Sequence, residues 1–342
     1  MNIVITGGAG FIGCNAAAYY LRKKADVVIF DNLSRKNTDK NLSWLKGLGG
    51  SLTYIKGDVR SVKDTGKLIS FLASADAVLH LAAQVAVTTS VTNPREDFDI
   101  NALGTFNMLE AMRAAGSRAK FIYSSTNKVY GGMEDVRVVE KNTRYEYADL
   151  PHGASEERPL DFHSPYGCSK GAADQYVHDY NRIYGLDTVV MRQSCIYGPR
   201  QFGVEDQGWV AWFIIATVLG KKLALYGDGK QVRDLLYVDD LIRAYDMAIL
   251  SGSKTRGKIY NIGGGPANTL SVWQEFGPML ERLFGREIPV TREDWRPGDQ
   301  KIFVADIRKA KKEFGWEPTI GVDDGIKRLY EWITANKTLF RP

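Results

Sequence analysis

Short apolar runs alternate with longer amphipathic stretches along the first half of the chain. After the opening run, the apolar runs lie at residues 27–30, 52–55, 77–81, 120–123 and 188–191. Such runs are typical of strands buried on both faces of a parallel sheet. The stretches between them predict helices at residues 11–23, 61–73, 94–115 and 166–184. This alternation predicts an α/β fold with a doubly wound parallel Rossmann sheet.

The regular alternation ends after residue 192, where loops containing glycine and proline begin. Two further helices are predicted, near residues 238–251 and 271–284. We therefore expect a Rossmann domain made of residues 1–192 with about 235–262. A smaller, interleaved α/β substrate domain should comprise residues 193–234 and 263–342.

Three glycines mark the junction between the first predicted strand and the first helix. Gly7, Gly10 and Gly13 enclose the apolar pair Phe11 and Ile12. Glycines at this junction let the backbone approach a pyrophosphate, which the amides and dipole of the helix N-terminus stabilise. These residues therefore predict a dinucleotide site, with an empty glycine-rich turn as the alternative.

Two carboxylates follow the next strands. Asp31 ends the second predicted strand, where it can accept both ribose hydroxyls of NAD and would repel the 2′-phosphate of NADP. Arg35 could hold that phosphate, but the position of Asp31 favours NAD. Asp58 follows the third strand and is a candidate for contact with the adenine, although it could instead cap the helix that follows.

Tyr166 and Lys170 lie four residues apart in a predicted helix, so their side chains share one face. A nearby ammonium favours the phenolate, and we expect Lys170 to lower the pKa of Tyr166 from about 10 so that the phenol can remove a hydroxyl proton. Thr126 ends the strand Ser124–Thr126 and would meet the same substrate oxygen. The pair occurs by chance in many helices, but with the glycine turn and Asp31 it predicts alcohol oxidation.

Composition narrows the possible partners. The chain has 342 residues, 44% of them hydrophobic, and a net charge of +5 carried by scattered Lys and Arg residues. This pattern is typical of a globular protein that binds anionic small molecules, with neither nucleic acid nor a membrane as partner. Three cysteines without metal-ligand spacing predict neither disulfides nor a metal site. We expect a cytoplasmic protein.

These motifs resemble the extended short-chain dehydrogenase/reductases that act on nucleotide sugars. The resemblance covers essentially the whole chain, through the motifs Thr6–Gly13, His80–Gln84, Tyr166–Lys170 and Arg296–Asp299. It implies that Lys170 also holds the nicotinamide ribose and that NAD remains bound through the catalytic cycle. The further cofactor contacts that it implies are Asn32, Ser34, Arg35, Asp58, Val59, Leu81, Ala82, Ala83, Gln84, Asn101 and Ser124.

The residues after Thr126 distinguish reactions within this family. Its 4,6-dehydratases carry Thr-Asp-Glu here, because elimination of water needs an acid and a base near carbons 5 and 6. This chain has Thr126-Asn127-Lys128. An amide and an ammonium do not readily replace that pair, so dehydration is disfavoured. Epimerisation needs only withdrawal of a hydride and its return to the other face.

The position of inversion depends on the resemblance alone. Segments 124–131, 161–176, 207–210 and 229–234 are similar to the family's 2-epimerases of CDP-linked hexoses. This implies oxidation at carbon 2, a transient 2-keto sugar and return of the hydride to the opposite face. The alternatives are inversion at carbon 4, as in UDP-hexose 4-epimerases, and an inactive NAD-sensing or scaffold protein, which the Tyr166 and Lys170 pair argues against.

The substrate would be a nucleoside diphosphate sugar. Arg233 and Arg296 match positions that clamp the pyrophosphate in the resembling enzymes, although each could instead pair with Asp234 or Asp299. Cys195 stands where many relatives have an asparagine, so that contact is in doubt. The full set of substrate candidates is Thr126, Asn127, Lys128, His163, Ser164, Gln207, Trp209, Arg233, Arg296 and Asp299. Trp209 is equally compatible with a core position, and Lys128 with a solvated loop.

Relatives associate through helices corresponding to 94–115 and 166–184, which implies a homo-oligomer.

Overall fold

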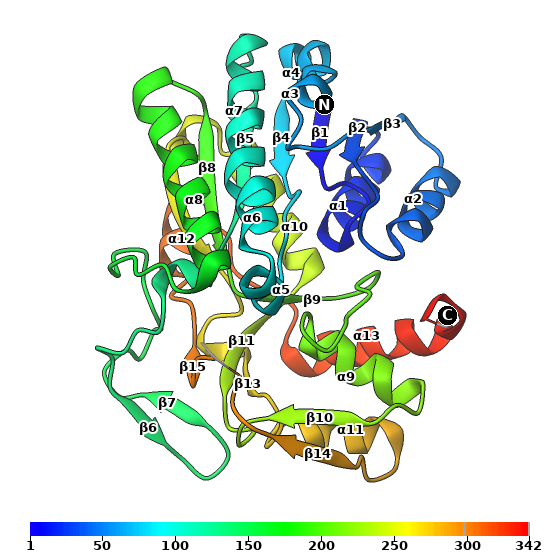
Figure 1. Cartoon of the computed structure of the whole chain (residues 1–342), viewed down its shortest axis with the longest axis vertical. Coiled ribbons are helices and arrows are strands. Elements are labelled where there is room, and N and C mark those ends of the chain that lie inside the picture. Colours follow the sequence, from blue (N-terminus) through cyan, green and yellow to red (C-terminus); the bar gives the residue numbers. More distant parts are fainter. Residues whose placement is uncertain (297–298, 341–342) are drawn as a thin grey trace.

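A parallel sheet organises the half of the molecule that contains the N-terminus (Figure 1). The computed structural model describes residues 1–296 and 299–340. Within these residues the sheet has seven strands in the order β12-β8-β5-β4-β1-β2-β3. Their bounds are β1 Asn2–Thr6, β2 Asp26–Asp31, β3 Leu52–Lys56, β4 Ala77–His80, β5 Lys120–Thr126, β8 Thr188–Gln193 and β12 Lys258–Ile262. The predicted doubly wound Rossmann fold is confirmed.

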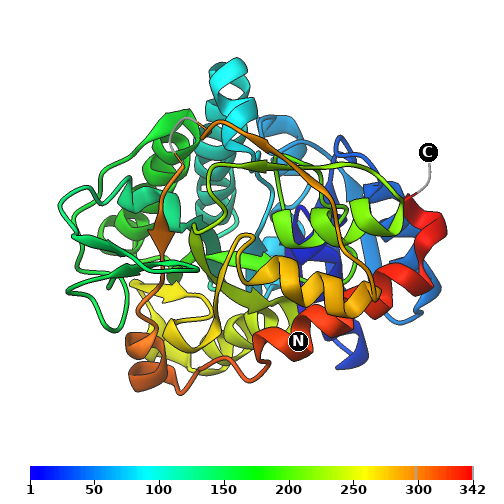
Figure 2. The same ribbon diagram turned by 90° about the horizontal axis from the view of Figure 1, so that it is seen from below.

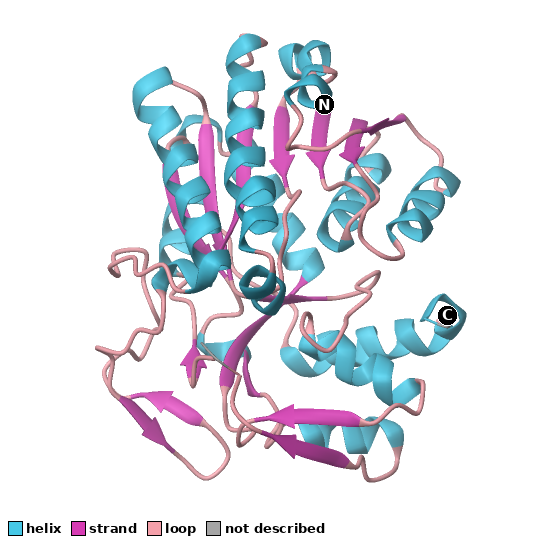
Figure 3. Cartoon of the chain, viewed as in Figure 1, coloured by secondary structure: helices cyan, strands magenta, loops and turns pink. Residues whose placement is uncertain are grey.

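Helices cover both faces of this sheet, as Figure 3 shows. The α-helices that accompany the sheet are α1 Phe11–Arg22, α2 Thr38–Gly47, α3 Val62–Gly66, α4 Ile69–Ser74, α5 Val87–Thr92, α6 Pro94–Phe98, α7 Gly104–Ala114, α8 Ser164–Tyr184, α10 Val238–Leu250 and α12 Arg308–Phe314. A π-helical segment, Asp99–Leu103, joins α6 to α7.

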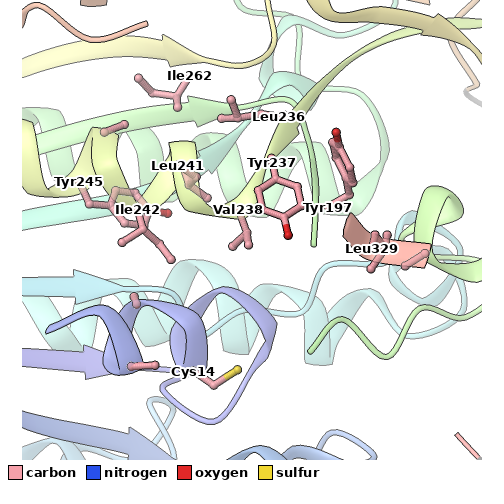
Figure 4. Packing of buried hydrophobic residues seen from close by; sticks show 14 of the residues in the cluster. Cys14, Tyr197, Leu236, Tyr237, Val238, Leu241, Ile242, Tyr245, Ile262 and Leu329 are labelled. Atoms are coloured by element: carbon pink, nitrogen blue, oxygen red, sulfur yellow. The ribbon is translucent and has the colours of Figure 1, made fainter. Parts of the chain in front are cut away.

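Alternate strand residues enter two separate cores, because successive side chains point to opposite faces of a sheet. In β1, Ile3 and Ile5 pack in the core that contains α1 and α10, whereas Val4 packs in the core that contains α7 and α8. Figure 4 shows how the first core reaches from Cys14 on α1 to Leu241 and Tyr245 on α10. Both faces of the strands are therefore buried, which explains their continuous apolar runs.

The second region lies beyond the carboxyl ends of the strands and consists of short strands and three helices within the described residues. Its strands are β6 Val138–Glu140, β7 Tyr145–Tyr147, β9 Cys195–Tyr197, β10 Leu223–Tyr226, β11 Val232–Tyr237, β13 Thr269–Ser271, β14 Val290–Glu293 and β15 Ile302–Phe303. Its helices are α9 Trp209–Val218, α11 Phe276–Phe284 and α13 Val322–Ala335. Helices α9 and α13 lie side by side in both Figure 1 and Figure 2.

The central element of this region is β11. It pairs with β13 in antiparallel fashion and with β9 and β15 in parallel. Because β12 pairs with β8 in the large sheet, the chain returns to that sheet after β11. These pairings agree with an interleaved second domain, although the division at residues 192, 235 and 262 stays a prediction.

Three predicted helices differ in detail from the structure. The helix expected at 61–73 is two short helices, because α3 ends at Gly66 and the chain turns before Ile69. The helix expected at 94–115 is interrupted by the π-helical segment. The helix expected from 271 begins at Phe276, since Thr269–Ser271 pair with β11 instead.

Candidate active site

One cavity runs along the carboxyl ends of the parallel strands, where open α/β sheets bind ligands. Its wall combines residues of the sheet side with residues that follow β8 and precede α9. The predicted site residues that line it are Gly7, Gly10, Phe11, Ile12, Gly13, Asp31, Asn32, Ser34, Arg35, Asp58, Val59, Leu81, Ala82, Ala83, Ser124, Thr126, Asn127, Lys128, Tyr166, Lys170, Gln207 and Trp209.

The glycine turn leaves no space for side chains on its inner side. A Cβ at Gly13 would lie 2.1 Å from the Gly7 carbonyl oxygen, and one at Gly7 would lie 2.7 Å from the Ala82 backbone nitrogen. Gly7 also has a positive φ of 68°, which favours glycine. Gly10 caps α1 without a side-chain hydrogen bond, so the first amides of this helix are available to an anion. This cradle fits the pyrophosphate of a dinucleotide.

Asp31 lines the cavity at the end of β2, and its carboxylate is oriented by backbone amides. Its Oδ2 accepts a hydrogen bond from the Ala9 N–H at 3.0 Å, and its Oδ1 accepts one from the Leu33 N–H at 2.8 Å. Burial raises the pKa of Asp31, while these backbone hydrogen bonds act in the opposite direction. Each carboxylate oxygen has a further lone pair, so the group retains the capacity to accept two ribose hydroxyls.

Asp58 is held by neighbouring side chains at the next strand end. Asn32 Nδ2 donates to it at 3.0 Å and Arg60 Nη2 at 2.7 Å. The hydrogen bond from Arg60 lowers the pKa of Asp58 to about 2. The cap of α3 is Ser61, whose Oγ accepts from the Asp64 N–H, so Asp58 does not serve as the helix cap that the sequence allowed.

Helix α8 brings Tyr166 and Lys170 to the cavity wall. The Lys170 ammonium donates to the Ser124 carbonyl oxygen and lies 4.3 Å from the centre of the Tyr123 ring. The Tyr166 backbone N–H, at the start of α8, donates to the buried Ser90 Oγ at 3.1 Å. Hydrogen bonds therefore hold Lys170 and the backbone of Tyr166 in place beside the end of β5.

The predicted direction of the Tyr166 pKa shift was wrong. Burial raises the pKa of Tyr166 to about 12, and the hydrogen bond with Thr126 offsets this only in part. Burial also lowers the pKa of Lys170 to about 7, against the opposing influence of Asp174 and Asp97. Desolvation is the main cause of both pKa shifts, because a water-poor wall disfavours the charged form of each group.

Thr126, Asn127 and Lys128 lie together at the end of β5. Thr126 Oγ1 donates to Asn127 Oδ1 at 3.3 Å, and the Lys128 ammonium donates to Gln300 Oε1 at the same distance. Burial and the neighbouring Arg233 lower the pKa of Lys128 to about 8. Among the described residues this ammonium forms no ion pair with a carboxylate. It lines the cavity as an unpaired cation.

Each of the two arginines expected to clamp pyrophosphate forms an ion pair with an acidic side chain. Arg233 pairs with Asp299 at 2.7 Å. Arg296 stacks on Tyr226, with 3.9 Å to the ring centre, and pairs with Asp206 at 3.2 Å. Neither arginine lines the cavity, and nor do Asp299, His163 and Ser164. Pro297 and Gly298 of the same motif lie outside the described residues.

Gln84 and Asn101 also lie behind the cavity wall. Asn101 Nδ2 donates to the Gln84 carbonyl oxygen at 3.1 Å, and both side chains donate to the buried Asp97. Ser169 on α8 donates to the same carboxylate. In this structure the two residues join the π-helical segment to α8, and a direct contact with the cofactor stays a prediction.

Many of the residues that line the cavity have no role predicted from the sequence. The lining residues without a predicted role are Phe30, Thr38, Gly57, Val85, Val87, Ile100, Ser125, Gln193, Ser194, Ile196, Tyr197, Gln201, Asp206, Gly208 and Val210, and Cys195 lines the cavity with them. Residues 193–197 lie at the end of β8 and directly after it, so the rule that ligands bind at strand ends would have identified them. Gln201 gave no such signal.

Comparisons with known proteins cover nearly the whole chain. The family described as GDP-mannose 4,6 dehydratase matches residues 4–329. The CDP-paratose 2-epimerase of Salmonella typhi is 46% identical, over 98% of this chain and all of that protein. Among solved structures, the UDP-glucose 4-epimerase of Thermotoga maritima with UDP-glucose has a TM-score of 0.82 at 31% identity, covering 99% of this chain and 100% of that one. A dTDP-glucose 4,6-dehydratase double mutant from Streptomyces venezuelae, solved with NAD, has a TM-score of 0.84 at 28% identity, covering 99% and 98%.

Proposed function

The chain belongs to the GDP-mannose 4,6-dehydratase family, and from this premise we propose that it is an NAD-dependent nucleotide-sugar 2-epimerase of the CDP-paratose type. The observation that carries this proposal is the cavity wall at the end of β5. Tyr166, Lys170 and Thr126 line it and would supply the groups needed for alcohol oxidation. Asn127 and Lys128 line it in place of the Asp-Glu pair that dehydration would need. The 46% identity to a CDP-paratose 2-epimerase supports inversion at carbon 2.

The residues that would hold NAD fit it. The glycine cradle and open N-terminus of α1 suit the pyrophosphate, and Asp31 suits the adenosine ribose. When bound, NAD supplies a hydride acceptor that later gives the same hydride back. Lys170 is placed to hold the nicotinamide ribose, beside Ser124.

Tyr166 has the central proton-transfer role. In its phenolate form Tyr166 would take the proton of the carbon-2 hydroxyl as the hydride leaves carbon 2, which gives a 2-keto sugar beside a neutral phenol. After the ketone presents its other face, the same phenol returns the proton to the oxygen while the hydride returns to carbon 2. Thr126, which lines the same cavity as Tyr166, would orient the reacting oxygen. The net reaction is an inversion without loss of atoms.

The site of inversion can be tested with several nucleotide sugars. We expect the purified protein to interconvert CDP-paratose and CDP-tyvelose and, in deuterated water, to leave carbon 2 unlabelled, because the hydride does not exchange with solvent. NMR of CDP-, GDP- and UDP-hexoses after incubation reports the configuration at carbons 2 and 4. Exclusive inversion at carbon 4 would contradict the proposal, and so would loss of water from the sugar.

Replacement of Lys128 by methionine should weaken substrate binding. We expect KM for the CDP-hexose to rise by about tenfold or more, because an ammonium without a carboxylate partner is available to a substrate oxygen. Lys128 faces Arg233, Asp299 and Cys195, and its pKa of about 8 means that it loses its proton above this pH. KM of the wild type should therefore increase above pH 8.

Lys128→Arg provides the matched control, because a guanidinium keeps its charge through this pH range. Steady-state kinetics between pH 6 and 10 would show the increase in KM for the wild type and its absence in the arginine variant. An unchanged KM in Lys128→Met would show that Lys128 has no part in substrate binding.

We further propose that the protein is a cytoplasmic homo-oligomer. Phe106 on α7 is partly exposed, as are Tyr176, Ile183 and Tyr184 on α8. Phe106 contacts Tyr176, and Tyr184 contacts the buried Tyr180. Apolar groups gathered on two helices are suited to pairing with the same face of a second copy. Three free cysteines are compatible with a reducing compartment. Within the described residues, no helix has the length and apolar character needed to cross a membrane.

A further inference from the structure

We propose that residues 199–208, which join β9 to α9, form a strap that closes over the dinucleotide cleft and slows the release of NAD. In Figure 1 this segment leaves β9 and extends toward the part of the molecule that contains α2 and α13. The proposal rests on the proposed function only in that the cleft holds NAD. The strap is defined here as residues 199–208.

The start of the strap is attached to the helix that begins at the glycine turn. Asn15 on α1 donates through Nδ2 to the Pro199 carbonyl oxygen at 2.9 Å, and to the Phe11 carbonyl oxygen at 2.8 Å. Phe11 itself lines the cavity beside Gly10 and Ile12. The strap therefore crosses close to the amides that would bind the cofactor pyrophosphate.

Arg200 fixes the strap between two tryptophans on different parts of the chain. Its guanidinium carbon lies 4.2 Å from the ring centre of Trp44 on α2 and 5.6 Å from that of Trp332 on α13. Arg200 has a positive φ of 67°, an unfavourable conformation for a residue with a side chain. The two ring contacts help to stabilise this conformation, since each cation–π contact is favourable.

The end of the chain reinforces this attachment. Phe340 contacts Phe202 of the strap, with 5.5 Å between ring centres, and Trp332, with 5.8 Å. Lys40 on α2 donates to the Leu339 carbonyl oxygen at 2.8 Å. Helix α2, the strap and the C-terminal segment are thus joined in one cluster, which must open before the strap can move away from the cleft.

The inner side of the strap carries a buried polar atom without a partner. Gln201 is only 6% exposed and lines the cavity. Its Nε2 donates to the Ile196 carbonyl oxygen at 3.3 Å, while its Oε1 has no hydrogen-bond partner among the described residues. Such an atom costs free energy until it accepts a hydrogen bond. A hydroxyl or an amide N–H of the bound dinucleotide would supply the missing donor.

Two further residues of the strap, Gly208 and Asp206, make its inner side compatible with a bound dinucleotide. Gly208 has a positive φ of 78°, and a Cβ there would lie 2.7 Å from the Gln201 Nε2, so the glycine leaves room for the side chain. Asp206, the acidic residue of the strap that lines the cavity, is paired with Arg296 at 3.2 Å. The ion pair reduces the repulsion that Asp206 would otherwise exert on a pyrophosphate.

Such a strap suits an enzyme that removes a hydride from its substrate and later returns the same hydride. Between the two halves of the proposed reaction the hydride is absent from the sugar, so escape of the cofactor would leave a stranded 2-keto product. Slow release of the cofactor prevents this loss. The strap lines the cleft through Gln201 and Asp206 and is attached to α1 beside the glycine turn, so it must be displaced before the dinucleotide can leave.

Replacement of Arg200 by alanine tests the strap directly. We expect the rate of NAD release to rise by about tenfold, since the variant loses two ring contacts. The rate can be measured by diluting the purified holoprotein into isotopically labelled NAD and following exchange by mass spectrometry. Lys221→Ala is the matched control, because it removes a cation 5.6 Å from the ring of Trp212, away from the cleft, and should release NAD at the wild-type rate.

Two more variants separate the strap from a general loss of structure. Gln201→Leu removes the unpartnered acceptor and introduces an apolar side chain of similar size. It should also increase the rate of NAD exchange. Arg200→Lys keeps the charge and should give an intermediate rate. Thermal unfolding of each apoprotein reports whether the variant folds like the wild type.

The outcomes distinguish failure of the strap from failure of the proposed function. Wild-type exchange rates in a folded Arg200→Ala variant that retains NAD would overturn the strap, even if the protein epimerises sugars. Faster exchange in Arg200→Ala and Gln201→Leu, with Lys221→Ala unchanged, would support it. A wild-type protein that binds no NAD would overturn both the strap and the proposed function.

Discussion

Replacing Tyr166 by phenylalanine is expected to lower kcat by about 10²- to 10⁴-fold, the range that a positioned acid–base group contributes. The phenol would be the only proton acceptor close to the carbon-2 oxygen in the proposed mechanism, and the loss of its hydroxyl removes both halves of the proton transfer. Because Tyr166 is buried and its backbone is fixed by Ser90, the ring should keep its place. NAD should therefore remain bound.

Turnover of CDP-paratose, measured by NMR, and the ratio of NAD to protein after purification together test this result. Tyr176→Phe is a suitable control, since Tyr176 lies on the same helix but is 50% exposed and outside the cavity. It should retain wild-type turnover. If Tyr166→Phe turned over as fast as the wild type, another group would have to carry the proton.

The fold could be predicted from the sequence because its signals are local. The apolar runs of β1 and β2 indicate strands, and the glycines between β1 and α1 indicate a tight turn. Each signal depends only on residues that are neighbours in the sequence. The same holds for Tyr166 and Lys170, since one helical turn places both on one face. Their pKa values could not be predicted, because burial depends on elements that are distant in the sequence.

Contacts over long distances in the sequence explain the other differences. Arg296 pairs with Asp206 instead of Asp299, and the approach of these two loops depends on how β10, β14 and α9 pack. The resemblance implies that Asn101 contacts the cofactor, yet its amide contacts Gln84 and Asp97 behind the wall. No pattern in the sequence places Gln201 at the cavity, because its position depends on the path of the chain between β9 and α9.

Replacing Asp174 by asparagine should produce the largest loss of stability among these changes. Asp174 is 0% exposed, and both of its carboxylate oxygens accept hydrogen bonds from Arg192, each at 3.0 Å. Ser125, next to Thr126, donates to the same carboxylate at 2.6 Å. Removing the negative charge leaves a buried guanidinium without its counter-ion, which costs about 3–5 kcal/mol. We expect the melting temperature to fall by about 5–15 °C.

The exposed pair between Asp179 and Arg182 on the same helix is the matched control. Asp179→Asn removes an ion pair whose side chains are about half exposed, and such pairs contribute less than about 1 kcal/mol. Chemical denaturation of both variants separates the two cases. Equal stabilities would show that the buried pair adds no more than a surface pair.

Asp174 also links stability to the proposed chemistry. It lies one helical turn after Lys170 and favours the protonated form of that lysine, so the charge-neutral variant should lower the pKa of Lys170 below its value of about 7. Less of the ammonium would then be present at neutral pH to hold the ribose and favour the Tyr166 phenolate. Folded Asp174→Asn protein should therefore show reduced kcat at pH 7, with partial recovery at lower pH where Lys170 is protonated again. Wild-type kcat and pH dependence in the folded variant would contradict this link.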